Sequence, residues 1–168
     1  MAIGYVLIAT TPEYDNMVYK ELQRVSEIVE VYGTAGEYNI LVKIVADDID
    51  SISEVVVSKI RKISGVTFTD TLPVIEKFSE HLKFPKATVG KNTEFLLVNT
   101  QPPRDANAYN EISKLQEIIE AYMVFGKYDI IVKVGVENVN VFLNYLMPKV
   151  RKISGVVFTK SLITRAVV

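Results

Sequence analysis

Two short motifs in the sequence combine residue types that could bind a small ligand. They share the pattern Gly-x-Tyr-(Asn/Asp) and consist of Gly36, Tyr38 and Asn39 and, 90 residues later, Gly126, Tyr128 and Asp129. A turn glycine lets backbone amides approach a ligand, tyrosine offers a ring and a hydroxyl, and the Asp129 carboxylate can accept hydrogen bonds from an ammonium group. Asn39 is a neutral acceptor, so we expect the first motif to bind such a cation more weakly. The same residue types also suit a hairpin turn that binds nothing.

Other chemistry is sparse in this chain. There is no cysteine, and the single histidine, His81, has no second histidine beside which it could hold a metal. Without a histidine in either motif region, a serine–histidine arrangement or a histidine base is excluded. We therefore expect no catalytic residue, no metal site and no cofactor, and no enzymatic activity.

The two motifs belong to a longer internal repeat. The segment 61–66, Arg-Lys-Ile-Ser-Gly-Val, recurs unchanged at 151–156, and the two copies align without a gap from Tyr5 and Phe95 to Leu72 and Leu162. Such a repeat indicates a tandem duplication of one structural unit. The sequence thus predicts a first unit at 1–75, a linker at 76–92 and a second unit at 93–168.

Each unit has the residue pattern of strand, helix, strand, strand, helix, strand. Val18, Leu22 and Val25 share one face of a helix, and the glycine motif joins two runs of β-forming residues as an antiparallel hairpin. Because crossovers between parallel strands are right-handed, this order predicts an α+β, ferredoxin-like βαββαβ sheet with both helices on one face.

The first strand of each unit is apolar on both faces, as in Tyr5-Val6-Leu7-Ile8. A sheet with one face in water would alternate apolar and polar residues, so the second face must be covered. A second sheet is the most economical cover. We therefore expect the two units to pair sheet to sheet about a pseudo-two-fold axis, in the manner of a dimeric α/β barrel.

Composition and charge limit the partners. The net charge is −1, which argues against broad, non-specific binding of nucleic acid. No apolar run approaches the ~20 residues of a membrane span, and the first residues lack the pattern of a signal peptide. We expect a cytoplasmic protein with no direct contact to nucleic acid or membrane, and the composition is weakly typical of a thermophile.

With these motifs, the chain resembles the effector-binding RAM domain of the Lrp/AsnC (feast/famine) family of transcription regulators. The resemblance rests on both Gly-x-Tyr-(Asn/Asp) motifs, the Ile-Ser-Gly-Val helix ends and the threonine-bearing strands that follow, and it covers residues 3–75 and 93–166. It implies a βαββαβ fold, pairing through the sheets, larger homo-oligomers, and an amino acid or similar effector bound near the glycine motif. The family's helix-turn-helix is missing from this sequence, so we expect no DNA binding by this chain alone.

These observations favour a stand-alone effector-binding module that senses a small molecule, with an amino acid as the expected effector, and modulates the assembly of full-length Lrp/AsnC-type regulators. Two alternatives remain open. One is an oligomerisation scaffold without a ligand, and the other is an enzyme of the dimeric α/β-barrel kind.

Overall fold

The computed structural model describes residues 1–75 and 92–167. The chain forms two compact units, Met1–Val74 with Thr164–Val168, and Ile75–Ile163. Each unit contains the βαββαβ order that the sequence predicts. The predicted linker lies outside the described residues together with His81, except for residue 92, which begins a strand.

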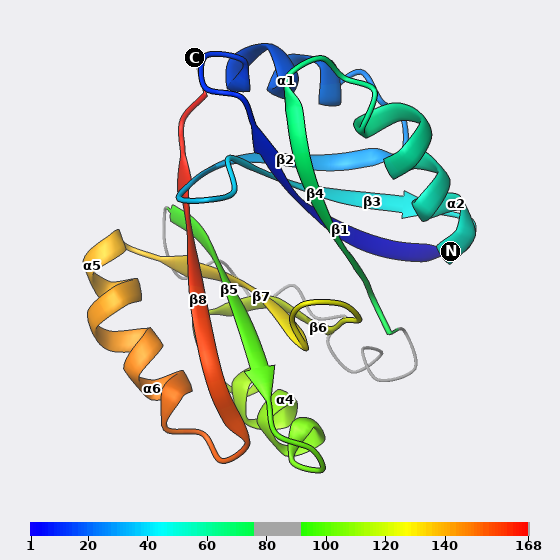
Figure 1. Cartoon of the computed structure of the whole chain (residues 1–168). Coiled ribbons are helices and arrows are strands. Elements are labelled where there is room, and N and C mark those ends of the chain that lie inside the picture. Colours follow the sequence, from blue (N-terminus) through cyan, green and yellow to red (C-terminus); the bar gives the residue numbers. More distant parts are fainter. Residues whose placement is uncertain (76–91, 168) are drawn as a thin grey trace. The chain divides into compact units, whose positions relative to one another are not determined.

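The first unit is a four-stranded antiparallel sheet with its helices on one face (Figure 1). Its strand order is β4-β1-β3-β2, as in a ferredoxin-like fold. The elements are β1 (Ala2–Thr10), α1 (Asp15–Leu22), β2 (Ile28–Ala35), β3 (Ile40–Ala46), α2 (Ile49–Val55), the π-helical turn η1 (Val56–Ile60) and β4 (Val66–Pro73).

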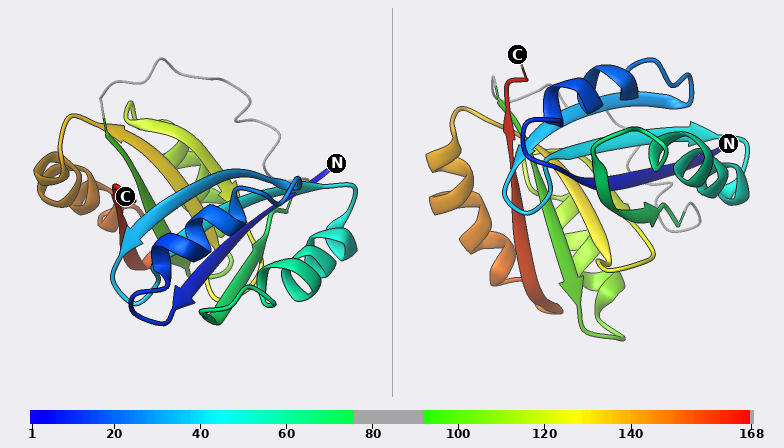
Figure 2. Two further views of the ribbon diagram at one scale, coloured as in Figure 1. Left: turned by 90° about the horizontal axis from the view of Figure 1, so that it is seen from above. Right: turned by 45° about the horizontal axis from the view of Figure 1, so that its top comes forward.

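The second unit repeats this plan with the strand order β8-β5-β7-β6. Figure 2 gives two further views of both units. The elements are β5 (Asn92–Thr100), α4 (Asp105–Ser113), β6 (Ile118–Met123), β7 (Ile130–Val136), α5 (Val139–Val141), the π-helical turn η3 (Phe142–Leu146), α6 (Met147–Arg151) and β8 (Val156–Arg165).

Each unit has its own apolar core between helices and sheet. In the first unit, Val18 and Leu22 of α1 are fully buried against Val6, Ile8 and other inward residues of the strands, which confirms the predicted helix face for these two residues. The prediction was wrong for Val25, because α1 ends at Leu22, and Val25 packs against the core from the segment that follows. The second core has the same construction around Ile112 and Phe142. Such burial supplies most of the stability of a small domain.

The strand faces that point away from the helices are apolar too. Tyr5, Leu7 and Leu41 are at most 1% exposed and lie outside the helix-side core. The prediction that the second face is covered is therefore confirmed for these residues. The predicted face-to-face pairing of the two sheets stays a prediction.

The units do not end where the repeats end. Residues from Thr164 onward belong to the first unit, where β8 follows β2 in the strand order. Conversely, Ile75 belongs to the second unit, and its amide donates to the Met123 carbonyl at the end of β6 (2.8 Å). Each compact unit therefore includes residues from the end of the other repeat. The predicted boundaries 1–75, 76–92 and 93–168 stay a prediction.

Candidate functional site

The two glycine motifs form the β2–β3 and β6–β7 hairpin loops. The first loop is closed by the Thr34 amide, which donates to the Asn39 carbonyl (2.8 Å), and the second by Val124 and Asp129 (2.9 Å). Gly36 and Gly126 have φ angles of 118° and 110°, a region that side chains other than glycine rarely adopt. Glycine is therefore needed for the turn itself.

The last residue of each motif connects the hairpin loop to the end of the first strand. Asn39 Oδ1 accepts a hydrogen bond from the Thr10 amide (2.8 Å), and Asp129 Oδ2 accepts one from the Thr100 amide (2.7 Å). A backbone N–H must meet an oxygen, so this contact also fixes which way the Asn39 amide points. Both residues thus perform the same structural task.

Both motif tyrosines are buried, with Tyr38 2% and Tyr128 3% exposed. The Tyr38 hydroxyl donates to Asp70 Oδ2, and its ring lies 6.5 Å from the Phe68 ring. In the second repeat the Lys127 ammonium lies 5.8 Å from the centre of the Tyr128 ring. The tyrosines therefore belong to the packing of the loops and leave little ring surface for a ligand.

The second loop carries two acceptor atoms without partners among the described residues. Asp129 uses Oδ2 for Thr100, which leaves Oδ1 without a hydrogen bond. Asn99 donates from Nδ2 to the Lys127 carbonyl (3.3 Å), and its Oδ1 is buried and accepts nothing. A buried acceptor without a donor is costly, so this loop favours a ligand that brings N–H groups.

Sequence reasoning missed Asn99. The signal was present, because the first repeat has Ala9 at the equivalent position. A polar residue that replaces an apolar one in an otherwise matched strand is the kind of departure that marks a site.

The first loop has a different neighbour, Arg165 of the C-terminal segment. Its guanidinium donates to the Thr34 carbonyl (3.1 Å) and the Asn39 carbonyl (3.4 Å), and it forms an ion pair with Asp15 (2.9 Å). In the second unit the equivalent residue is Ile75, which packs against the apolar core. The first loop therefore has a cation built in, whereas the second has none at that position.

The part of the chain that the structure describes contains neither a candidate metal site nor a helix suited to span a membrane. Residues 1–75 and 92–167 contain no group of three or more His, Cys, Asp or Glu side chains placed to hold a metal ion. None of the helices within these ranges has both the length and the apolar character to cross a membrane.

Comparison with known proteins identifies the family. The model of the Lrp/AsnC ligand binding domain matches residues 4–84 and 93–166, once for each repeat. The chain belongs to this family, with two such domains in tandem, as the resemblance predicted.

Curated relatives include the regulatory protein AsnC from two bacteria. The protein of Escherichia coli (strain K12) is 30% identical over 71 residues, which are 42% of this chain and 46% of AsnC. The protein of Haemophilus influenzae is 30% identical over 67 residues, 40% of this chain and 44% of AsnC. The chain thus spans just under half the length of these relatives.

A solved structure resembles the whole chain. The siroheme decarboxylase NirDL matches 98% of this chain and 71% of its own chain, with a TM-score of 0.73 and 8% sequence identity. At this identity the likeness establishes the fold alone. It supports the tandem arrangement of two βαββαβ units.

Proposed function

We propose that the chain is an effector-binding module that senses a free amino acid through its second hairpin loop. The observation that carries this proposal is the pair of unpartnered acceptors, Asp129 Oδ1 and Asn99 Oδ1, at one junction of loop and strand. An α-ammonium group brings three N–H donors and a positive charge, and hydrogen bonds between charged groups are about twice as strong as neutral ones. The family, whose domain is described as ligand binding, supports the same conclusion.

The first loop is expected to respond differently to the same effector. Asn39 has no charge, and Arg165 already donates to the loop carbonyls. An ammonium group would meet a fixed cation there and no carboxylate of the motif. The proposed sensor therefore has one working cation-binding loop for each chain.

We propose that the effector acts on assembly. Relatives named AsnC are regulators, and a module of this family that joins such regulators would change their association when its effector binds. A ligand shifts an assembly equilibrium only by its difference in affinity for the two states. The module would act by binding rather than catalysis, as part of a homo-oligomer or with full-length regulators, and without contact to nucleic acid.

The test is a thermal-shift screen of the full chain against the free amino acids, with light scattering to follow mass. A ligand at 100 times its Kd stabilises the folded state by about 2.7 kcal/mol. We expect a shift with one amino acid or a small group of similar ones. Asp129→Asn keeps the acceptor for Thr100 and removes the charge, so it should abolish this shift without unfolding the loop.

The matched control is the reverse exchange, Asn39→Asp in the first loop. It should leave the response of the second loop intact. An amino-acid response that survives in Asp129→Asn would rule out the proposed loop as the site.

The second candidate is an oligomerisation scaffold without an effector. One observation favours it: the glycines, the tyrosines and one oxygen of each Asn39 and Asp129 side chain are all accounted for by the hairpin itself. A defined oligomer that responds to no amino acid would support the scaffold and exclude the sensor.

A further inference from the structure

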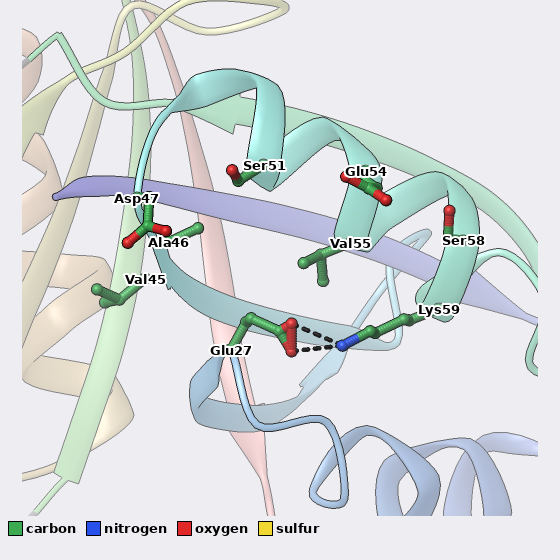
Figure 3. Close-up of a pocket in the computed structure, with 9 residues that line it drawn as sticks. All are labelled: Glu27, Val45, Ala46, Asp47, Ser51, Glu54, Val55, Ser58 and Lys59. Atoms are coloured by element: carbon green, nitrogen blue, oxygen red, sulfur yellow. Dashed lines mark hydrogen bonds and ion pairs between the residues drawn. The ribbon is translucent and has the colours of Figure 1, made fainter.

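A concave site recurs at the same place in both repeats, away from the hairpin loops. In the first unit it has a volume of about 410 Å³ and lies between the end of β3 and the α2–η1 helix (Figure 3). In the second unit it has a volume of about 390 Å³ between the end of β7 and the equivalent helix. Six positions line both cavities: Glu27/Glu117, Val45/Gly135, Ala46/Val136, Asp47/Glu137, Ser51/Val141 and Val55/Tyr145.

The first cavity is closed by an internal ion pair. The Lys59 ammonium reaches across it to Glu27 and lies 2.7 Å from each carboxylate oxygen (Figure 3). This contact, aided by the Ser26 hydroxyl, lowers the pKa of Glu27. In the first repeat, the primary ammonium group of Lys59 therefore already forms an ion pair with the Glu27 carboxylate of the cavity.

In the second cavity the equivalent lysine points to another partner. Lys149 Nζ donates to the Tyr145 hydroxyl (2.8 Å) and lies 4.0 Å from the centre of its ring. The hydrogen bond to Tyr145 raises the pKa of Lys149, and the nearby Glu117 carboxylate adds to this effect. Val55, at the position of Tyr145 in the first repeat, can offer neither a hydroxyl nor a ring to Lys59.

This difference leaves Glu117 without a cation in contact. Glu117 Oε2 is buried and has no hydrogen-bond partner among the described residues, while the Lys149 ammonium donates to the Tyr145 hydroxyl instead. The two repeats thus hold the same carboxylate and the same lysine, paired in one and apart in the other.

We infer that the second cavity binds a primary ammonium group on a short alkyl chain, with Glu117 as its receptor. The Lys59 ammonium in the first repeat shows the position that the ligand's nitrogen would take. The alkyl side chain of Lys59 indicates that the rest of the ligand would be a short alkyl chain. Val136 and Val141 line the second cavity with apolar surface, and Glu137 adds a second carboxylate to its lining. A ligand ammonium would supply the donor that Glu117 Oε2 lacks, which removes the cost of a buried acceptor left alone.

The experiment uses the full chain and n-butylamine at neutral pH, with n-butanol as the uncharged probe of the same shape. Binding is followed by ¹⁵N–¹H correlation spectra, which report on each backbone amide. We expect n-butylamine to shift amides around Glu117 and Gly135, and n-butanol to leave them in place. Glu117→Gln, which keeps the shape of the side chain, should weaken binding by about tenfold or more, because it removes a charged hydrogen bond.

Three further variants use the repeat as its own control. Glu27→Gln should leave n-butylamine binding unchanged, because Lys59 already occupies that carboxylate. Lys59→Met should release Glu27 and create a second set of shifts around the first cavity. In contrast, Tyr145→Val should free Lys149 to reach Glu117 and abolish binding in the second.

Equal shifts with n-butanol, or n-butylamine binding that Glu117→Gln does not weaken, would overturn the inference. The result is separable from the fate of the hairpin-loop proposal. Asp129→Asn should leave the n-butylamine shifts unchanged, and Glu117→Gln should leave any amino-acid response unchanged.

Discussion

The two hairpin loops have nearly the same backbone and opposite electrostatic character. Asn39 and Asp129 each accept a hydrogen bond from the threonine amide at the end of the first strand. Around this shared contact, the first loop has the Arg165 guanidinium, whereas the second has a carboxylate oxygen and Asn99 Oδ1 without donors.

The residues that cap the second helix of each repeat also differ as Asp and Asn, but here the aspartate is in the first repeat. Asp48 caps helix α2 by accepting from the Ser51 amide, and Asn138 caps the equivalent helix α5 by accepting from Val141. Asp and Asn share one acceptor oxygen and differ in charge. Either residue can therefore make the hydrogen bond that the fold needs. The charge at this position can differ between the two repeats, and functional differences can arise from it.

The largest expected effect comes from Gly33, which stands where the second repeat has Met123. A Cβ on Gly33 would overlap Val167 Cγ2 and would lie 3.0 Å from the Arg165 carbonyl oxygen. Gly33→Val should displace the C-terminal segment and lower the stability of the first unit by about 3 kcal/mol. Thermal melting measures this loss, and an unchanged melting temperature would contradict the described packing. Met123→Leu is the matched control and should have a much smaller effect.

The next effect separates the structural role of Asp129 from its charge. Asp129→Ala leaves the amide of Thr100, a buried residue, without its acceptor and should cost about 2 kcal/mol. Asp129→Asn restores the contact as Asn39 makes it and should melt close to the parent. If both variants lost stability equally, the comparison between the loops would fail. Urea denaturation of the three proteins decides this.

A smaller effect is expected from Arg165. Arg165→Met removes its hydrogen bonds to the first loop and its half-buried ion pair with Asp15, at a cost of about 1 kcal/mol. Hydrogen exchange of the Thr34 and Asn39 region should quicken, while the second loop stays protected. Ile75→Met, at the equivalent apolar position, should leave the first loop unaffected.

The smallest effect concerns the Glu27–Lys59 ion pair of the first cavity. Because the contact with Lys59 lowers the pKa of Glu27, its stabilisation is present above the ordinary pKa of a glutamate and is lost as the pH falls through the lowered value. Glu27→Gln should therefore reduce stability by about 0.5 kcal/mol at neutral pH and flatten the loss on acidification. Melting curves from neutral to acid pH measure the difference. If Glu27→Gln loses as much stability on acidification as the parent, other carboxylates are responsible for that loss.

Much of the fold could be predicted from the sequence because its signals are local and repeated. Alternating and helical apolar patterns such as Val18 and Leu22, and the exact recurrence of 61–66 at 151–156, were enough for two βαββαβ units. The exchange of strand ends, in which Ile75 belongs to the second unit and residues from Thr164 onward belong to the first, could not be predicted. Nothing in the residues near Ile75 or Arg165 indicates which strand edge they will join. That choice depends on long-range pairing.

The candidate site was predicted only in part. The glycine motif indicated the loops, and Asn39 against Asp129 indicated their difference in charge. The burial of Tyr38 and Tyr128 and the role of Thr10 and Thr100 depend on side-chain packing that spacing does not encode. The Tyr145–Lys149 contact was hidden for the same reason, although the change from Val55 was visible.

The exchanged strand ends have a consequence for the order in which the protein can be completed on the ribosome. The first unit consists of Met1–Val74 together with residues from Thr164 onward, so its last piece is synthesised about 90 residues after the rest. At ~5–20 residues per second the nascent first unit waits roughly 5 to 18 s with the β2 edge unpaired. An unpaired edge is open to wrong partners, and the second unit, whose borrowed Ile75 is made before its own strands, has no such delay.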